Sequence, residues 1–409
     1  MIAGLRSFTA VARSAPRAAS LAARCISGSS TTLSPEHTFE FGTPAVTHHC
    51  DGPENSTVAT QAELDEYLEM MLRMRRMEIA FDNEYKARNI RGFCHLYDGQ
   101  EAVGLGLEKA LTRDDSWITS YRCHAIALAR GASVESVAAE LFGFRSGIAK
   151  GKGGSMHMYS KAENFYGGAG IVGAQVPLGV GLAFANKYNA GHEPPMNVAI
   201  AAYGDGAANQ GQIWEVANMS KLWGLPMIFV IENNQYGMGT SVERHSSNPD
   251  YYTMGGNIPG IKADGMDVLA VREAARYCRQ HCSEGNGPIY LELTTYRYHG
   301  HSMSDPGITY RDREEVANTR STRDPIENVK RMMLEAGFRT EEEIKAVEKS
   351  VRKEVSAAIK AAKACSLPDE RELYTEIYSD GAGGSEYLPY TRAVEHNMSI
   401  GSDGQVIQA

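Results

Sequence analysis

Residues 198–234 read VAIAAYGDGAANQGQIWEVANMSKLWGLPMIFVIENN. The runs 198–203 and 227–231 are short and continuously apolar, which is typical of strands that are buried on both faces. The stretch 212–223 between them has the length and composition of a helix, so the segment predicts one β-α-β unit. A unit of this kind belongs to a parallel sheet that is covered by helices.

Polar residues follow both strands of this unit. Asp205 stands between Gly204 and Gly206 directly after the first strand, and Asn234 follows the second strand. The carboxyl ends of parallel strands meet at one edge of a sheet, so we expect Asp205 and Asn234 to lie close together. Their oxygens, with the backbone carbonyl of Tyr236, suit a Mg²⁺ ion whose shell is completed by phosphate. The alternative is an ordinary strand-to-helix turn that is capped by Asp205.

Further helices and strands surround this unit. Apolar residues recur at helical intervals after Thr60, which has capping-box spacing to Glu63, and they predict a helix to about Arg88. A third apolar strand is expected at 289–296, with a helix before it at 268–281. The predicted fold class is therefore α/β, with a parallel sheet covered by helices and with helical extensions at the N- and C-terminal ends.

The C-terminal part predicts two helices. One opens at Asp324-Pro325, and the second is capped by Thr340 with Glu343. We expect residues 55–380 to form one α/β domain that includes these helices. Residues 381–409 mix Gly, Ser, Tyr and charge without periodicity and are expected to form a tail or a partner contact.

Glycine is concentrated between residues 143 and 181, where it makes up eleven of 39 residues. Glycine lets backbone approach a ligand or another segment closely, although a flexible surface loop is the alternative. An apolar helix follows at 177–184, and its Gly179 and Ala183 lie four residues apart. Small residues at this spacing favour close helix packing.

Two patterns within this region suggest other ligands. Residues 168–173 satisfy the dinucleotide pattern G-x-G-x-x-G, but no apolar strand precedes them and no suitable acid closes a β-α-β unit behind them. Gly151-Lys152-Gly153 resembles part of a phosphate loop, yet Gly153 stands where Ser or Thr is required. Neither a nicotinamide site nor an ATPase site is expected.

Composition narrows the class of protein. The chain has 409 residues, of which 43% are hydrophobic and 22% charged, so it can bury a large core and is not intrinsically disordered. Its net charge of −9 argues against a nucleic-acid partner. The longest apolar run, 225–231, is far shorter than the roughly 20 residues of a membrane-spanning helix.

Residues 1–30 carry arginine, serine and alanine without an acidic residue. This composition is typical of a transit peptide, and a disordered basic tail is the alternative. The seven cysteines imply no disulfide framework and fit a reducing compartment such as the mitochondrial matrix. Cys278, His281 and Cys282 lack a second ligand pair at zinc-site spacing, so buried structural thiols are expected.

Several motifs carry a resemblance to known enzymes. Residues 204–211 together with Glu232-Asn233-Asn234 resemble the motif by which thiamine-diphosphate enzymes hold their cofactor through a metal. A narrower likeness is to the alpha subunits of mitochondrial pyruvate dehydrogenases. Residues 296–307, YRYHGHSMSDPG, resemble the regulated loop of that family. Three more segments match it, and the likeness covers about residues 60–330 well: RGFCHL at 91–96, KGKGGSMHM at 150–158 and YGMGTSVER at 236–244.

The resemblance implies contacts to Mg²⁺ and to thiamine diphosphate. The positions that match are Asp205, Asn234 and the Tyr236 carbonyl for the metal; Gly206, Ala207, Tyr121 and Arg122 for the diphosphate; and Gly170 and Val172 for the cofactor rings. An arginine beside a doubly charged phosphate group is physically sensible, although Tyr121 and Arg122 could equally serve an ordinary surface ion pair. The inserted stretch 160–164 departs from the family and leaves local contacts there open.

Three histidines are candidates for the chemistry. His299 and His301 lie just past a predicted strand, on a loop where an imidazole can reach a ligand at the sheet edge. By resemblance His301 approaches the cofactor and assists acyl transfer, and His95 contacts pyruvate. A single histidine is more often structural or exposed than catalytic, which is the alternative for each of them.

Three hydroxyl groups match positions at which the family is inhibited by phosphorylation, namely Ser302, Thr309 and Ser241. Thr309 stands where serine is usual. Phosphate on Ser302 would place about two negative charges next to His301. The alternative is that all three are ordinary loop hydroxyls.

The activity that the resemblance implies is the oxidative decarboxylation of pyruvate in the mitochondrial matrix, with transfer of the acetyl group to a lipoyl group. A glutamate that assists the cofactor would come from a beta subunit, which implies an α2β2 tetramer. A lipoyl-bearing acetyltransferase and a regulatory kinase and phosphatase are the other implied partners. The rival functions are a branched-chain 2-oxoacid dehydrogenase alpha subunit, a nicotinamide oxidoreductase and a non-enzymatic partner protein.

Overall fold

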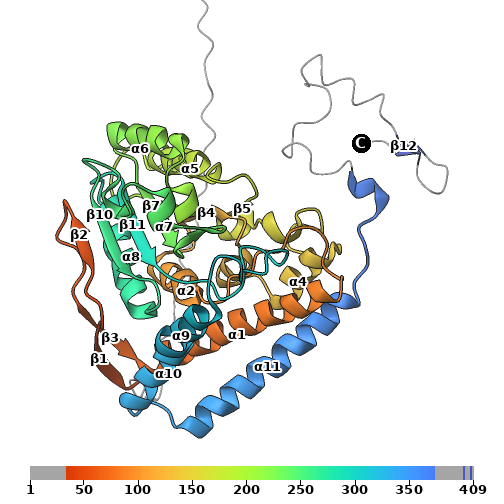
Figure 1. Cartoon of the computed structure of the whole chain (residues 1–409). Helices are drawn as coiled ribbons and strands as arrows, with labels where there is room; N and C mark the ends of the chain where they lie inside the picture. Colours follow the sequence, from red (N-terminus) through yellow and green to blue (C-terminus); the bar gives the residue numbers. More distant parts are fainter. Residues whose placement is uncertain (1–33, 374–398, 401–405, 408–409) are drawn as a thin grey trace, which may run out of the picture. The chain divides into compact units, whose positions relative to one another are not determined.

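The computed structural model describes residues 34–373, 399–400 and 406–407, so the predicted leader and most of the predicted tail lie outside the described residues. The described residues from Pro35 to Leu373 form one unit around a seven-stranded sheet (Figure 1). In spatial order the strands are β2 (Val46–His48), β10 (Gly260–Asp264), β11 (Ile289–Thr294), β7 (Met227–Asn233), β6 (Ala199–Gly204), β4 (Ser116–Ser120) and β5 (Phe165–Ala169). All neighbours in the sheet are parallel except β2, which runs antiparallel to β10.

The predicted α/β class with a mainly parallel sheet is confirmed. The β-α-β unit read from residues 198–234 is present as β6, α6 (Gly211–Trp223) and β7. The helix and strand expected near 268–296 are α8 (Val268–Ser283) and β11. Strands β2, β4, β5 and β10 of the sheet were not expected from the sequence.

The sheet separates two hydrophobic layers, because successive strand side chains point to opposite faces. In β6, Ile200 and Ala202 belong to one cluster, whereas Ala199 and Ala201 belong to the other. The first layer packs against α8, α2 (Glu101–Ala110) and the long outer helices, and the second packs against α5 (Gln175–Asn189) and α6. The helix expected at 177–184 is thus part of α5.

The outer helices begin where their caps predict. Helix α1 (Gln61–Lys86) and helix α11 (Glu341–Lys363) both have a complete capping box, made by Thr60 with Glu63 and by Thr340 with Glu343. Helix α10 (Pro325–Glu335) is capped by Asp324. Helices α1 and α11 run side by side (Figure 1). These predictions are confirmed.

The remaining elements are short. The helices are α3 (His124–Ala129), α4 (Val134–Phe142), α7 (Val242–His245) and α9 (Arg313–Arg323), and the 3-10 turns include η1 (Gly154–Met156) and η3 (Asp205–Ala207). Three antiparallel pairs are β1 (Glu36–Glu40) with β3 (Ser56–Thr60), β8 (Tyr236–Gly237) with β9 (Thr240–Ser241), and β12 (Ser399–Ile400) with β13 (Val406–Ile407). The N-terminal extension is therefore only partly helical, since β1, β2 and β3 precede α1.

A strand that the sequence did not predict overlaps the glycine pattern at 168–173. Strand β5 runs Phe165–Ala169 and includes Gly168. Only its first two residues have large side chains, so the sequence shows no apolar run there. In the sheet, β4 lies between β5 and β6, so the unit lacks the adjacent strands that form a dinucleotide-binding β-α-β unit.

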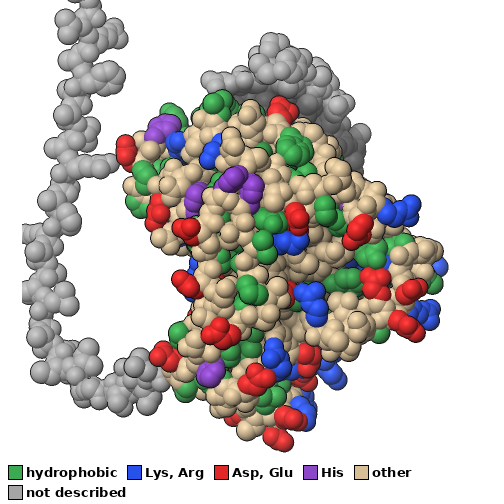
Figure 2. Space-filling model, turned by 60° about the vertical axis from the view of Figure 1, so that its left-hand side comes forward, with side chains coloured by type: hydrophobic (Ala, Val, Ile, Leu, Met, Phe, Trp, Pro, Cys, Tyr) green, Lys and Arg blue, Asp and Glu red, His purple; other side chains and the backbone are tan. Residues whose placement is uncertain are grey.

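The surface carries charges of both signs. On the face in Figure 2, acidic and basic side chains are interspersed over the body of the chain. Among the helices that the structure describes, none is long and apolar enough to cross a membrane.

Candidate active site at the carboxyl edge of the sheet

The predicted site residues come from segments that follow the carboxyl ends of neighbouring strands. Tyr121 and Arg122 follow β4, Val172 follows β5, and Asp205 follows β6. Asn234 follows β7, and the loop that carries His301 begins after β11. Since β11, β7, β6, β4 and β5 are consecutive neighbours in a parallel sheet, these five strand ends bring segments from across the chain to one edge.

A cavity of about 350 Å³ lies at this edge. It brings together most of the site residues expected from the sequence, which are Tyr121, Arg122, Val172, Asp205, Gly206, Ala207, Asn234, Tyr236 and His301. Two expected residues do not line it. His95 is buried behind Tyr121, with ring centroids 4.4 Å apart, and Gly170 lies beside His157.

Asp205 and Asn234 both line the cavity. Both side chains are buried, at 1% and 7% exposed. The Nδ2 of Asn234 donates to Oε1 of Gln100 at 3.0 Å, and its Oδ1 has no hydrogen-bond partner among the described residues. A buried amide oxygen without a partner is costly, so it marks a position where a ligand completes the site.

The turn after β6 approaches the β8–β9 hairpin closely. A Cβ atom on Gly206 would lie only 2.9 Å from Cα of Gly237, so only glycine lets the two backbones come this near. The contact keeps Asp205 and Tyr236, which flank the two glycines, on neighbouring loops. His245 adds a further group here, since its Nε2 lies 3.4 Å from Oδ2 of Asp205, and this hydrogen bond raises the pKa of His245.

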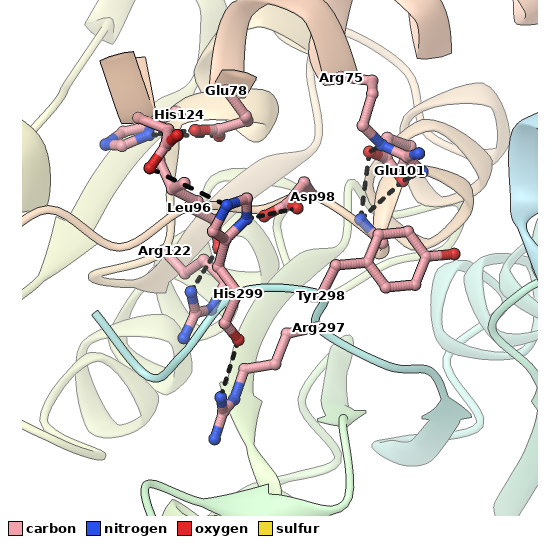
Figure 3. A network of polar contacts seen from close by, with 12 residues as sticks. Arg75, Glu78, Leu96, Asp98, Glu101, Arg122, His124, Arg297, Tyr298 and His299 are labelled. Carbon is pink, nitrogen blue, oxygen red and sulfur yellow. Dashed lines mark hydrogen bonds and ion pairs between the residues drawn. The ribbon is translucent and has the colours of Figure 1, made fainter. Parts of the chain in front are cut away.

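Arg122 links two segments that are distant in sequence. Its NH2 group donates to the carbonyl of His301 at 2.9 Å, and its NH1 group donates to the carbonyl of Leu96. Figure 3 shows Arg122 and Leu96 in this arrangement. The side chain is 4% exposed, so the guanidinium brings a buried positive charge to the cavity wall.

Tyr121, His95 and His301 form a cluster of rings, with centroids 4.4 to 5.5 Å apart. Burial, followed by the charge of Arg122, lowers the pKa of His301 to about 4. The same two causes lower the pKa of His95 to about 2. Both imidazoles are therefore neutral near pH 7, and each can accept a hydrogen bond at its unprotonated ring nitrogen.

His299 faces away from this cavity. Its Nδ1 lies 2.7 Å from Oδ2 of the buried Asp98 (Figure 3), and this hydrogen bond raises the pKa of His299. Its ring instead lines a second cavity of about 500 Å³ that is formed by the end of α1, the loop after β11 and α9. Of the two histidines that we expected on this loop, only His301 lines the candidate site.

The sequence analysis did not identify Glu232 as a candidate site residue. This residue lines the cavity, and burial raises its pKa to about 7. Tyr97, which lies 135 residues away in sequence, donates its hydroxyl to Oε1 of Glu232 at 2.5 Å. The signal was present in the Glu232-Asn233-Asn234 motif, but an acid at the end of an apolar strand resembles an ordinary strand terminus.

The three candidate phosphorylation residues differ in exposure. Thr309 is exposed, Ser241 is half-buried at the start of α7, and Ser302 is only 7% exposed. The Ser302 hydroxyl lies 2.9 Å from that of Ser304. Asp305 holds this loop by accepting from the backbone N–H groups of His301 at 2.7 Å and Gly307 at 2.8 Å.

Among the described residues, the cysteines form neither a disulfide nor a metal site of the zinc type. The six cysteines that the structure describes are all free, and Cys278 and Cys282 are fully buried. Burial raises the pKa of both thiols, which favours the neutral form. Within the described residues, no group of three or more His, Cys, Asp or Glu side chains could hold a metal ion. Of the oxygen donors predicted at the sheet edge, which are Asp205, Asn234 and the Tyr236 carbonyl, only Asp205 is a side chain of these four types.

The chain is similar to a family of known enzymes. The sequence profile described as "Dehydrogenase E1 component" matches residues 69–370. The chain is 52% identical to pyruvate dehydrogenase E1 component subunit alpha-1, mitochondrial, of Arabidopsis thaliana, over 88% of this chain and 92% of the relative. It is 55% identical to the corresponding alpha subunit of Dictyostelium discoideum, over 84% and 89%, and 52% identical to the human testis-specific form, over 90% and 94%. Identity above one half along most of both chains leaves one conclusion, that this chain belongs to the dehydrogenase E1 component family.

Proposed function

We infer that this chain is the alpha subunit of the E1 component of mitochondrial pyruvate dehydrogenase. The observation that carries this conclusion is the identity of 52–55% to alpha subunits of that name from a plant, an amoeba and human, over nearly their full length. The same identity favours pyruvate over branched-chain 2-oxoacids. The chain is an enzyme subunit that acts in the oxidative decarboxylation of pyruvate and feeds acetyl-CoA formation. We place it in the mitochondrial matrix.

Membership of this family implies dependence on thiamine diphosphate. The residues present fit such a group, because the cavity carries a cation at Arg122, a buried carboxylate at Asp205 and an amide oxygen at Asn234 that has no partner among the described residues. We propose that Mg²⁺ joins the cofactor to this chain through the side chains of Asp205 and Asn234 and the carbonyl of Tyr236. Oxygen donors of this kind are what Mg²⁺ accepts beside phosphate.

The other site residues would hold and orient the cofactor and substrate. Gly206, Ala207, Tyr121 and Arg122 would contact the diphosphate, and Gly170 and Val172 would lie beside the rings. When bound, thiamine diphosphate supplies the electron sink for decarboxylation. His301, which is neutral at its buried position, can accept or deliver a proton at its ring nitrogen during acetyl transfer. His95 would orient pyruvate from behind Tyr121.

An alpha subunit of this component implies a beta subunit as partner. We propose an α2β2 tetramer in which the beta subunit supplies the glutamate that assists the cofactor. The acetyl group would pass to the lipoyl group of the next component. A kinase and a phosphatase would act on Ser302, Thr309 and Ser241, and the burial of Ser302 requires its loop to open before it is modified. In domain terms, we propose a leader at 1–30, a cofactor domain at 55–380 and a tail at 381–409.

The test is pyruvate decarboxylation, read with an artificial electron acceptor, for this chain alone and mixed with a beta subunit. Each mixture is measured with and without thiamine diphosphate and Mg²⁺, and branched-chain 2-oxoacids serve as alternative substrates. We expect activity with pyruvate only in the complete mixture. Activity of the chain alone would refute the shared site, and faster turnover of branched-chain substrates would refute the substrate assignment.

A further inference from the structure

The functions proposed above leave the segment 147–158, here called the cradle segment, without a role. It contains the Gly151-Lys152-Gly153 pattern that resembles part of a phosphate loop. Its backbone has positive φ at Lys150 (57°), Gly151 (78°) and Gly154 (64°). Turns of this type direct several N–H groups towards one point and form sites for anions.

The anion in this cradle belongs to the chain itself. Glu140, on α4, is fully buried, and its Oε2 accepts from the N–H groups of Ala149 at 2.8 Å and Gly151 at 2.9 Å. Its Oε1 accepts from Gly153 at 2.7 Å and Gly154 at 3.0 Å. A single carboxylate therefore satisfies four backbone donors, and such charge-assisted hydrogen bonds are stronger than neutral ones.

A second anchor holds the same segment at Ser155. The Nε2 of His124 lies 2.7 Å from the Ser155 hydroxyl, and its Nδ1 lies 3.0 Å from Oε2 of Glu78 (Figure 3). All three side chains are buried. Glu78 and Ser155 thus each contact one ring nitrogen of His124, which ties Ser155 to α1 and α3. His124 lies two residues after Arg122, which lines the candidate active-site cavity, so this contact connects the cradle segment to that cavity.

The cradle segment packs against the end of β5. A Cβ atom on Gly168 would lie 2.4 Å from the carbonyl oxygen of Met156, and one on Gly170 would lie 3.2 Å from Nε2 of His157. At Gly168, backbone thus approaches backbone with no side chain between. The position of the chain that leads from Gly170 to Val172 therefore depends on where the cradle segment lies.

We propose that Glu140 and Ser155 are positioning residues that hold the cradle segment against Gly168 and Gly170 and thereby fix the ring end of the cofactor cavity. This inference rests on the proposed function, because it takes Gly170 and Val172 to lie beside the cofactor rings. It predicts that loss of either anchor weakens cofactor binding more than turnover.

The experiment uses Glu140→Gln in the complete complex with the beta subunit. Gln keeps the size of the side chain but presents an NH₂ group to backbone donors. We expect the thiamine diphosphate concentration for half-maximal activity to rise about tenfold or more, with kcat at saturating cofactor within about threefold of wild type. Hydrogen exchange in peptides covering residues 149–154 should become faster in the cofactor-free complex.

Glu135→Gln is the matched control, since Glu135 is exposed on the same helix, and it should change neither quantity. If the Glu140→Gln variant does not assemble, Ser155→Ala is used instead, because it removes one neutral hydrogen bond. We expect it to raise the thiamine diphosphate concentration for half-maximal activity about threefold, again with little change in kcat. Unchanged exchange, or faster exchange with an unchanged cofactor requirement, would overturn the proposal. A wild-type complex without cofactor-dependent pyruvate turnover would instead overturn the function, while the exchange comparison still tests the Glu140 anchor.

Discussion

The side-chain amide of Asn234 has two ends with different surroundings. Its nitrogen donates to Gln100, and its oxygen has no hydrogen-bond partner among the described residues, in the cavity that Asp205 also lines. Gln100 is fully buried and lies directly before α2, so the direction of the amide is set by a packed element. A ligand that must be held in one orientation needs such support from neighbouring groups.

We expect Asp205→Asn and Asn234→Ala to abolish Mg²⁺-dependent retention of thiamine diphosphate while the fold persists. Each change removes one oxygen ligand or its charge at a site with few ligands from the protein. Cofactor content after desalting, together with circular dichroism, measures both effects. Asn218→Ala, at an exposed position on α6, serves as the control. If either variant retained the cofactor fully, the assignment of Asp205 and Asn234 as Mg²⁺ ligands would be refuted.

His299 allows a prediction about pH. Its hydrogen bond to Asp98 raises its pKa, so the folded state gains stability that is fully present below the ordinary pKa of about 6.5 and is lost as pH rises through the raised value. We expect the Tm of wild type to exceed that of His299→Gln at pH 6 and the difference to shrink at pH 8.5. A difference that is equal at both values would show that the contact is not charge-dependent.

Helix α5 shows how an element is placed by a single small residue. A Cβ atom on Gly179 would lie 2.7 Å from Cβ of Ala201 on β6 and 3.1 Å from Ile118 on β4. The helix therefore lies closer to the sheet at this position than a residue with a Cβ atom would allow. The expectation of close packing that we drew from Gly179 and Ala183 agrees with this contact.

We expect Gly179→Ala to lower stability by about 1–3 kcal/mol, because the added methyl group overpacks the contact between α5 and the sheet. Gly181 lies two residues further on the same helix, and a Cβ atom added there would have nothing within 4 Å. Gly181→Ala should therefore leave stability unchanged or raise it by up to about 1 kcal/mol through helix propensity. Urea titrations of the two variants give the comparison, and equal effects would contradict it.

Elements with strong periodicity or clear caps could be predicted from the sequence, and weakly marked ones could not. The capping boxes at Thr60 and Thr340 and the apolar strands β6 and β7 carry their own signals. Strand β4 reads SWITS and β5 reads FYGGA, so neither shows an apolar run, and their identity as strands depends on neighbours in the sheet.

The same limit applies to the site. The proximity of Asp205 and Asn234 follows from two visible strands, whereas Tyr121 and Arg122 follow β4 and could be assigned only by resemblance. The pairing of Glu232 with Tyr97 joins two segments 135 residues apart. Contacts of that separation are decided by the packing of the whole fold, which local sequence patterns do not encode.

At the scale of the whole molecule, the body from Pro35 onward has its own core and its own sheet. We therefore expect a chain that begins at residue 31 to retain full activity with the beta subunit, since every proposed site residue lies after residue 30. Steady-state kinetics of the full chain and of the shortened chain test this prediction. We expect their kcat and KM values to agree within about twofold. A marked loss of activity would show that the first 30 residues belong to the working enzyme.

The two edge strands of the seven-stranded sheet affect how readily partly folded copies of the chain aggregate. The β2 edge has three residues, and β5 at the other edge carries two glycines and pairs with β4 through an irregular register. Short and irregular edges are poor templates for added strands from other chains. Edges of this kind lower the tendency of partly folded copies of the chain to pair with one another.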